Sequence, residues 1–558
     1  MFRPGKLSAC VLASLAGGLT PLAWRPAPSD PPAASQSLTE PARARVVAED
    51  GFVRADLELQ PNLEPVRSAI FLSYRNRGIG RVAIRNRGEA LRGELQVRFD
   101  LPGRADLLPE PVVDLFDEIE SGEVRDVAIR PRFAPAILEE PTTELRARIE
   151  VTHRPVGSSE SRVIAARETL LVLVDRSSVT WDLPERLAAL IDPASVAALV
   201  RQDLARRERV CPKESGRLSI VNLELAAVIF DTLRAQGLRY LKDAPESAAA
   251  ALLEAPVDQV SLPTETLRDH AGDCDDLSVL LSSALESAGV PTALAYSDEH
   301  IIVLFDLGIG IEAAETAGLE RASLLERSGR VWMPIEATAL ARASATLMRA
   351  WSDGRAQLEM LRSGAMRLFE IRKAWRDYPA IGGMTPRENV DGSIPHETER
   401  CSDGAAELAL HLVTQVAARA ETARQDAGSE GEADLRAARV WLEAGLPSEA
   451  RALLRRSLER QPDVGTRLEL ARAILQHPGG RQDLDEARSA LEVVLAEADP
   501  MDLALRGETL RQLAEAYRLL GNPVRAARML ADEAALLGRT ADSESGLALV
   551  GGPLAASH

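Results

Sequence analysis

The sequence predicts a multidomain protein with an N-terminal antiparallel β-sandwich, a central α+β domain and a C-terminal array of helical repeats. Three observations support this prediction. Residues 46–178 alternate apolar and polar side chains in short runs between turn residues. Residues 179–375 mix amphipathic helical stretches with β-branched apolar runs, and residues 406–545 repeat a helical pattern rich in alanine and leucine. A chain of 558 residues is long enough for several such domains.

The N-terminal 25 residues have the composition of a secretory signal or an uncleaved anchor. Arg3 and Lys6 precede an apolar stretch that runs from Leu7 to Trp24. Two glycines and a proline inside this stretch disfavour a lasting transmembrane helix. We therefore expect an exported protein of a bacterial periplasm or cell envelope, with a Pro/Ala-rich linker at 26–45 and no membrane contact beyond this possible anchor.

The segment at 46–178 shows the alternation of strands that bury one face of a sheet. It contains no cluster of catalytic side-chain types, so we expect a spacer or recognition domain. Six strand-like segments are separated by turn residues: 71–78, 80–88, 93–103, 124–131, 144–153 and 168–175.

The excess of acidic side chains argues against nucleic acids as partners. The chain has 84 acidic and 66 basic side chains, and its formal net charge is −18. A surface of this sign repels phosphate backbones and anionic membranes, and no basic run offsets it. We expect no nucleic-acid partner.

The central domain begins with helices from Trp181 onward. The stretch from Asn222 to Gly237 has apolar residues at helical spacing, so we expect a packed helix that backs the one described next. Its apolar positions are Leu223, Ala226, Ala227, Phe230 and Leu233.

Cys274 stands between a Gly-Asp turn and the first turn of a predicted amphipathic helix. That helix is expected to end near Gly289 and Pro291. Unpaired backbone N–H groups at a helix N-terminus favour thiolate over thiol, so we expect the pKa of Cys274 to be lowered. The pattern indicates a nucleophile, while a small packing cysteine is the alternative. Apolar positions of this helix are Leu277, Leu280, Leu281, Ala284, Leu285 and Ala288.

A base and an acid follow at the ends of two strand-like runs. His300 begins the run HIIVLFDLG, and Glu336 ends the run RVWMPIE. Neighbouring strands would bring the two side chains together. A thiol nucleophile needs a base of this kind and a third group that orients the base.

These residues resemble the transglutaminase-like superfamily, whose papain-like core has a cysteine on a helix, a histidine on one strand and an acid on the next. The similarity covers about 222–351. Two departures stand out: Glu336 replaces the usual aspartate, and Ile301 follows the histidine where an aromatic residue is common. The matching positions are Gly272, Cys274 and Asp276 of the nucleophile motif, Gly289 and Pro291 after its helix, His300, and Trp332, Glu336 and Thr338 of the acid motif.

The resemblance implies a catalytic triad of Cys274, His300 and Glu336. It implies no cofactor and no metal. The residues expected to support the triad are Gly272, Asp273, Asp276, Trp332 and Thr338.

Three acids beside the cysteine conflict with its activation, because negative charge raises a thiol pKa. We expect Asp276 to turn away and bind backbone N–H groups at the helix start. Asp275 is equally compatible with a solvated surface position. His270, Cys274, His300 and a nearby aspartate form an alternative zinc set, although they lack the paired spacing of structural zinc sites. The sequence leaves two candidates for the hydrogen-bond donor of the oxyanion hole: the Cys274 N–H and a side chain of the preceding helix.

The other cysteines allow two further expectations. LSAC, ending at Cys10, is similar to a bacterial lipobox, although no apolar stretch precedes it. In an oxidising compartment, a disulfide between Cys211 and Cys401 would leave Cys274 as the free thiol.

A linker is expected at 376–405 and a short tail at 546–558. Between them the chain resembles tetratricopeptide repeats in three copies over about 433–537, the middle one with a lengthened turn around Gly479. A plain helical bundle is the alternative. The matching positions are Trp441, Gly445, Ala450, Leu454 and Pro462; Ala471, Leu475, Ala487 and Leu491; and Ala514, Tyr517, Gly521, Ala526 and Leu530.

Two functions follow from this sequence. The first is an exported thiol enzyme that acts on amide bonds of a protein or peptide substrate through an acyl-enzyme, hydrolysis being favoured over crosslinking, with repeats that bind a protein partner. The second is a non-catalytic envelope adaptor in which all three domains only bind partners.

Overall fold

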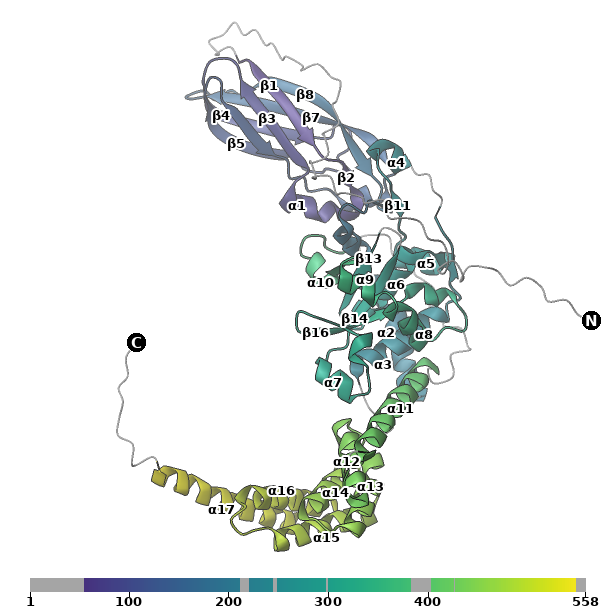
Figure 1. The fold of residues 1–558 in the computed structure, drawn as a ribbon. Helices are drawn as coiled ribbons and strands as arrows, with labels where there is room; N and C mark the ends of the chain where they lie inside the picture. The colour runs from purple at the N-terminus through teal and green to yellow at the C-terminus, as the bar shows by residue number, and fades with distance from the viewer. Residues whose placement is uncertain are drawn as a thin grey trace, which may run out of the picture.

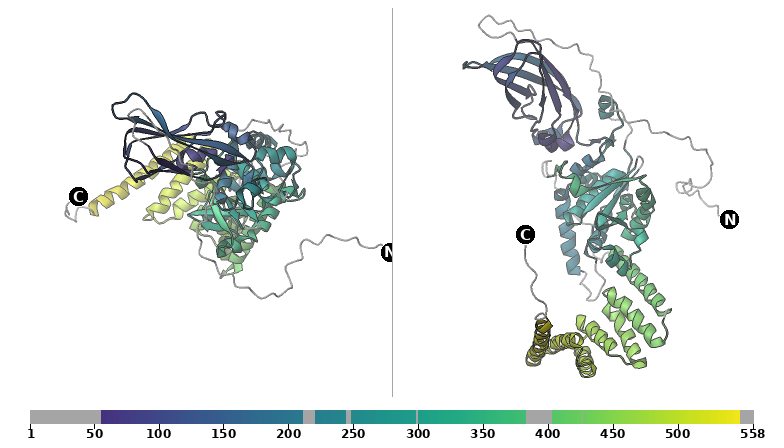
Figure 2. Two further views of the ribbon diagram at one scale, coloured as in Figure 1. Left: turned by 90° about the horizontal axis from the view of Figure 1, so that it is seen from above. Right: turned by 60° about the vertical axis from the view of Figure 1, so that its left-hand side comes forward.

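The protein is described by a computed structural model at residues 55–210, 220–243, 248–297, 300–382, 403–425 and 427–547. A β-rich N-terminal region, a central α/β region and a C-terminal helical region follow one another along a bent, elongated molecule (Figures 1 and 2). The expected signal segment, Cys10, Cys211 and Cys401 lie outside the described residues.

Two sheets form the N-terminal region. One has the strand order β1-β3-β6 and the other β2-β8-β7-β4-β5, and all neighbours are antiparallel except β2 and β8. The bounds are β1 Leu57–Leu63, β2 Val66–Arg67, β3 Gly80–Asn86, β4 Leu91–Asp100, β5 Val112–Ile119, β6 Val124–Ala128, β7 Thr143–Pro155 and β8 Arg162–Val174.

Alternating side chains of both sheets meet in one core. Val97 of β4 lies opposite Val151 of β7, and Val82 of β3 lies opposite Val127 of β6. All four are buried members of a single hydrophobic cluster. The period-two pattern therefore identified the inward faces correctly.

One predicted strand is wrong. The segment at 71–78 forms the end of a 3₁₀ helix (Ser68–Ser73) and a short helix, α1 (Tyr74–Arg77), which Gly78 ends with φ +75°. Phe71 and Tyr74 are three residues apart, so a helical turn buries both, and Tyr74 accepts a hydrogen bond from the Arg67 N–H. Tertiary packing thus overrides a weak local pattern. Strands β1 and β5 were not expected.

The central region is built on a separate five-stranded sheet, wholly antiparallel, in the order β15-β16-β14-β13-β17. Its bounds are β13 Thr292–Tyr296, β14 Ile301–Asp306, β15 Leu325–Arg327, β16 Arg330–Ile335 and β17 Arg367–Glu370. Short strands lie outside it: β9 Ser178–Val179, β10 Arg239–Tyr240, β11 Asp258–Gln259 and β12 Ala271–Gly272.

Helix α6 (Cys274–Ser287) packs against β13 and β14, and α2 (Pro193–Val210) and α3 (Val221–Arg234) pack on α6. The helix expected to back α6 is therefore in place. The remaining helices are α4 Ala248–Leu253, α5 Pro263–Asp269, α7 Ile311–Thr316, α8 Leu347–Arg355, α9 Leu358–Ser363 and α10 Ile371–Ala374.

Three pairs of packed helices form the C-terminal region. Gly445 and Gly521 end the first helix of the first and third pair with φ near +75°, a conformation that glycine adopts without strain. The middle pair has the longer turn that the sequence predicts, between Gln476 and Arg481. The bounds are α12 Glu430–Glu443, α13 Pro447–Arg460, α14 Val464–Gln476, α15 Arg481–Glu497, α16 Leu503–Leu519 and α17 Pro523–Leu547.

Helix α11 (Asp403–Gln425) connects the helical pairs to the central region. It contacts α3 and α8 on one side and α12 on the other. Leu408 and Leu412 belong to the central hydrophobic cluster, whereas Val416 packs with Ala444 and Leu446. The helix is therefore shared by two cores, and its first residues fall inside the predicted linker.

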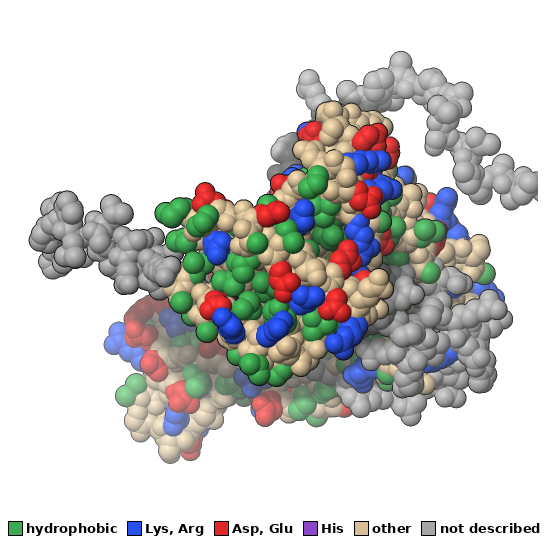
Figure 3. Space-filling model, turned by 90° about the horizontal axis from the view of Figure 1, so that it is seen from below, with side chains coloured by type: hydrophobic (Ala, Val, Ile, Leu, Met, Phe, Trp, Pro, Cys, Tyr) green, Lys and Arg blue, Asp and Glu red, His purple; other side chains and the backbone are tan. Residues whose placement is uncertain are grey.

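The helical end exposes scattered apolar side chains. Seen from that end, hydrophobic groups are interspersed with charged ones (Figure 3). Large exposed examples are Leu410, Met501, Val524 and Leu530. No described helix combines the length and the apolar character needed to cross a bilayer.

Candidate active site

Cys274 is the first residue of α6, as the sequence predicts. Asp273 caps the helix and accepts a hydrogen bond from the Asp275 N–H at 3.3 Å. The Asp276 carboxylate accepts one from the Asp273 N–H at 3.2 Å and a second from the Ser261 N–H at 2.7 Å. The expectation that Asp276 binds backbone N–H groups is confirmed, because its oxygens fix the start of the helix.

Gly272 is needed because Asp276 folds back over it. A Cβ atom added at Gly272 would lie 2.6 Å from the Asp276 Cβ atom. That distance is far shorter than a carbon–carbon contact allows. Gly272 and Asp276 of the nucleophile motif therefore depend on each other.

Replacing Gly272 by alanine should lower the free energy of unfolding by about 1–3 kcal/mol, because the helix start must move to admit the methyl group. Chemical denaturation would measure this. Gly310→Ala is the matched control, since its added Cβ atom would meet nothing closer than a Glu312 carboxylate oxygen at 3.7 Å. Equal losses in the two variants would contradict this explanation.

His300 and Glu336 meet because their strands are neighbours. Strands β14 and β16 pair antiparallel with Val303 opposite Ile335. His300 precedes β14 and Glu336 follows β16, and His300 Nε2 lies 2.6 Å from Glu336 Oε2. The structure thus brings together two of the three predicted catalytic side chains.

Thr338 holds the carboxyl group of Glu336. Its backbone N–H and its hydroxyl both donate to Glu336 Oε1, at 3.0 and 2.6 Å. The other oxygen, Oε2, is left for His300. This arrangement fixes which nitrogen of His300 faces the acid, and it leaves Nδ1 without a hydrogen bond among the described residues.

The contact between His300 and Glu336 changes the pKa of both side chains. The hydrogen bond to Glu336 raises the pKa of His300 above its ordinary value, against the opposing effect of burial. Burial alone would raise the pKa of Glu336, but the hydrogen bonds from His300 and Thr338 lower it. The pair therefore stabilises the fold most between about pH 4.5 and pH 6.5. This contribution is lost as the pH rises through the folded pKa of His300, and also as the pH falls through the folded pKa of Glu336.

Trp332 supports the site from behind. It is fully buried and packs on the sheet face opposite α6, together with Ala293, Ala295, Ile302 and Leu304. Alternate β14 residues, such as Val303, belong to the core on the α6 side. Trp332 therefore anchors the strand that ends at Glu336.

The thiol of Cys274 is half-buried, and among the described residues it forms no hydrogen bond with His300. Burial and the carboxyl groups of Asp275, Asp273 and Asp258 raise its pKa to about 12. The expectation of a lowered pKa is therefore wrong for this state of the protein. Negative charge and burial outweigh the helix N-terminus.

Alkylation of Cys274 by iodoacetamide should consequently become about tenfold faster with each pH unit between pH 7 and 10, because the thiolate fraction grows in that proportion below the pKa. Peptide mapping by mass spectrometry would follow Cys274 separately from the other three cysteines. A plateau in the rate below pH 8 would contradict the raised pKa.

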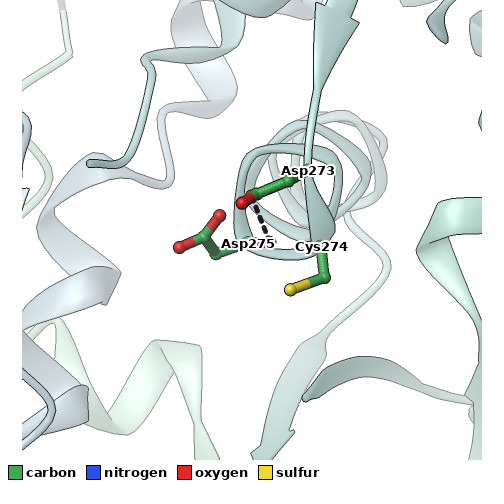
Figure 4. Close-up of side chains that lie close together, drawn as sticks. All are labelled: Asp273, Cys274 and Asp275. Atoms are coloured by element: carbon green, nitrogen blue, oxygen red, sulfur yellow. Dashed lines mark hydrogen bonds between the residues drawn. The ribbon is translucent and has the colours of Figure 1, made fainter. Parts of the chain in front are cut away.

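Asp275 is not a solvated surface residue. Its side chain is 1% exposed, and its carboxyl group points toward that of Asp273 beside Cys274 (Figure 4). Burial and the nearby Asp273 raise the pKa of Asp275 well above its ordinary value. The sequence gives no sign of this burial, since acidic residues in the first turn of a helix usually face water.

His270 does not join the site. It is exposed, has φ +48°, and its Nδ1 lies 2.7 Å from the Gln236 carbonyl oxygen. Within the described part of the chain, the groups of side chains close enough to share a metal ion include neither His270 nor His300. The alternative zinc set is therefore not assembled.

Two residues near Cys274 were missed by the sequence reasoning. Tyr240 lies opposite Gly272 in the parallel pair β10–β12, and the neighbouring Leu241 N–H donates to the Gly272 carbonyl. Burial and the charges of Cys274 and nearby acids raise the pKa of Tyr240 to about 12. Asp258, on β11, is also close to the thiol. Two-residue strands leave no periodic pattern that would have identified either residue.

Comparison with protein-family models and with curated proteins finds no match to this chain.

Proposed function

We propose that this protein is a transglutaminase-like cysteine enzyme that acts on amide bonds of a protein or peptide. The observation that supports this most directly is the 2.6 Å contact of His300 Nε2 with Glu336, on strands that pack against the helix beginning at Cys274. A buried acid that orients an imidazole near a helix-start cysteine is the arrangement that thiol acyl transfer uses.

The proposed reaction uses each side chain for one task. His300 Nδ1 takes the thiol proton as Cys274 Sγ forms a bond to the amide carbonyl carbon. The carbon–nitrogen bond then breaks, and His300 returns the proton to the leaving amine. Water attacks the thioester in the second half, which releases the acid and regenerates the thiol. Glu336 accepts the hydrogen bond from Nε2–H throughout, so that Nδ1 is the nitrogen that takes and returns the proton.

Trapping an acyl-enzyme tests the proposal. The full-length protein incubated with a peptide library should gain mass on the peptide that contains Cys274, and Cys274→Ala should gain none. Gly310→Ala is a suitable folding control, because it changes no residue of the site. If no adduct forms on Cys274 with any peptide or thiol-directed acylating probe, the enzymatic proposal fails.

The raised pKa of Cys274 favours a second candidate, a non-catalytic adaptor. A thiol with a pKa of about 12 that forms no hydrogen bond with His300 in the described residues is not poised for attack. Under this alternative, Cys274 would react no faster than a small-molecule thiol of the same pKa. The acylation experiment therefore separates the two candidates.

The C-terminal helices are proposed to form tetratricopeptide-like repeats that bind a protein partner. The regular helix pairs support this, together with burial of Ala450, Ala487 and Ala526 at equivalent positions. We propose export to a bacterial envelope on the composition of the N-terminal segment alone. Partner capture with the full chain, compared with a chain that ends at 425, would test the role of the repeats.

A further inference from the structure

Helix α8 holds the backbone of Glu336. Strand β16 pairs with β14 as far as Ile335, and the next N–H, that of Glu336, donates to the Ala350 carbonyl of α8 at 3.0 Å. Ala350 is fully buried, so this hydrogen bond is shielded from water. The carboxyl group of Glu336 is held by Thr338 on one oxygen and meets His300 with the other. Helix α8 therefore supplies a further contact that fixes the place of the acid.

Helix α8 also packs directly on the backbone of β16. A Cβ atom added at Gly354 would lie 2.8 Å from the carbonyl carbon and oxygen of Pro334 and 2.9 Å from the Ile335 nitrogen. These distances are shorter than van der Waals contact, and backbone atoms of a paired strand cannot rotate away as the end of a side chain does. Ala350 lies about one turn before Gly354, so its carbonyl would move with the helix. Gly354 thus determines how closely α8 approaches the strand that ends at the acid.

Helix α11 contacts α8 as well. The rings of His411 on α11 and Trp351 on α8 meet edge to face, with centroids 5.9 Å apart and an interplanar angle of 85°. Trp351 is buried, and its Nε1–H donates to the Ser323 carbonyl at 3.2 Å, which holds the ring in one orientation. Since Trp351 directly follows Ala350, a shift of α11 acts beside the residue that binds the Glu336 N–H.

We propose that α8 positions the acid of the proposed triad, with Gly354 as a positioning residue, and that α11 acts on this acid through the contact of His411 with Trp351. The expected effect on acylation rests on the proposed function. The expected effect on the contact between His300 and Glu336 does not, because that contact is measured in the protein without a substrate.

Nitrogen NMR of His300 in the full-length Gly354→Ala variant tests the first part. The added methyl group should move α8 off β16 and weaken the hydrogen bond between Glu336 and His300. Burial, which lowers the pKa of His300, would then prevail, so we expect this pKa to fall by about half a pH unit or more. Arg355→Ala is the matched control, because it changes the next residue of the same helix at an exposed position and should leave the pKa of His300 unchanged.

Acylation by p-nitrophenyl acetate gives the second readout. Cys274 Sγ attacks the ester carbonyl carbon, His300 takes the thiol proton, and the carbon–oxygen bond to p-nitrophenolate breaks. The release of p-nitrophenolate, corrected for the rate of Cys274→Ala, should fall by about 10–100-fold in Gly354→Ala, as for a catalytic group displaced by a fraction of an ångström. It should not fall in Arg355→Ala.

Substitutions of His411 test the role of α11. His411→Ala removes the ring edge that contacts Trp351, so it should lower the pKa of His300 and slow acylation, by less than Gly354→Ala does. His411→Phe keeps an aromatic edge at this place and should restore both quantities. His411 is half-buried, so this pair of variants also guards against misfolding of Gly354→Ala. A loss in His411→Ala that His411→Phe does not restore would refute the role of α11.

Ile381→Ala separates positioning from a general loss of stability. Ile381 is buried in the same core, and its N–H donates to the Ala189 carbonyl, outside α8 and β16. This variant should be less stable but should keep the pKa of His300. An unchanged pKa of His300 in Gly354→Ala, or an equal change in Ile381→Ala, would overturn the proposal. If the wild-type protein acylates no faster than Cys274→Ala, the proposed function fails, while the NMR comparison still decides whether α8 positions the acid.

Discussion

Replacing Glu336 by glutamine is expected to reduce acylation of Cys274 by about 10³–10⁴-fold while the fold is retained. The reason lies in the hydrogen bonds of the carboxyl group. Thr338 donates twice to Oε1, so a glutamine would keep its carbonyl oxygen there and turn its NH₂ group toward His300 Nε2. His300 Nε2 would then have to accept a hydrogen bond from this NH₂ group. The proton of the neutral imidazole would therefore move to Nδ1. An imidazole protonated on Nδ1 cannot take the thiol proton.

Nitrogen NMR of His300 measures this change without a known substrate. The wild-type imidazole should carry its neutral-form proton on Nε2, and the Glu336→Gln variant should carry it on Nδ1. The pKa of His300 should also fall, because the hydrogen bond that raises it is lost while burial, which lowers it, remains. Thr338→Val is the informative comparison, since it removes one of the two donors that orient the amide. An unchanged tautomer in Glu336→Gln would show that Glu336 does not set the state of the imidazole.

Replacing Asp434 by alanine is expected to destabilise the helical region by about 3 kcal/mol. Asp434 is fully buried on α12, and its carboxyl group accepts hydrogen bonds from Arg424 of α11 and from Arg456 and Arg460 of α13. Its removal leaves three arginines in close proximity without their shared acid. Denaturant unfolding and hydrogen exchange of α12 and α13 would measure the loss.

The stabilisation by Asp434 and its three arginines is expected to fall as the pH is lowered. Burial alone would raise the pKa of Asp434, but the arginine hydrogen bonds lower it. Its contribution is therefore complete above about pH 4, the ordinary range of an aspartate, and disappears as the pH falls through the folded pKa. Asp485→Ala is the control, because its ion pair with Arg488 is exposed and should be worth less than about 0.5 kcal/mol. Equal effects of the two substitutions would refute a special role for Asp434.

The parts of the fold that the sequence predicts well are those with a strong period. The alternation in β7 and β8 and the helical spacing of α3 reflect burial of one face, which is a property of the residues themselves. Helix α6 was predicted as a helix, but it is buried on every side from Asp275 to Glu286, and not on one face as expected. The His300–Glu336 contact was also predictable, because each side chain lies at the end of an apolar strand and the two strands follow closely in the chain.

The environment of Cys274 was not predictable in the same way. The helix N-terminus is a local feature and was identified correctly, whereas Asp258 and Tyr240 reach the thiol through long-range pairing of very short strands. The burial of Asp275 likewise depends on how α6 packs. The sign of the pKa shift follows from these contacts, so a local motif alone gave the wrong direction.

Helix α11 determines where the C-terminal helices lie relative to the central region. Its Leu408 and Leu412 lie in the central core and its Val416 in the next one. The connection is therefore a packed helix and not a flexible linker, so the C-terminal helices are held in one orientation relative to Cys274. Shortening α11 would rotate the C-terminal helices around its axis by about 100° for each residue removed.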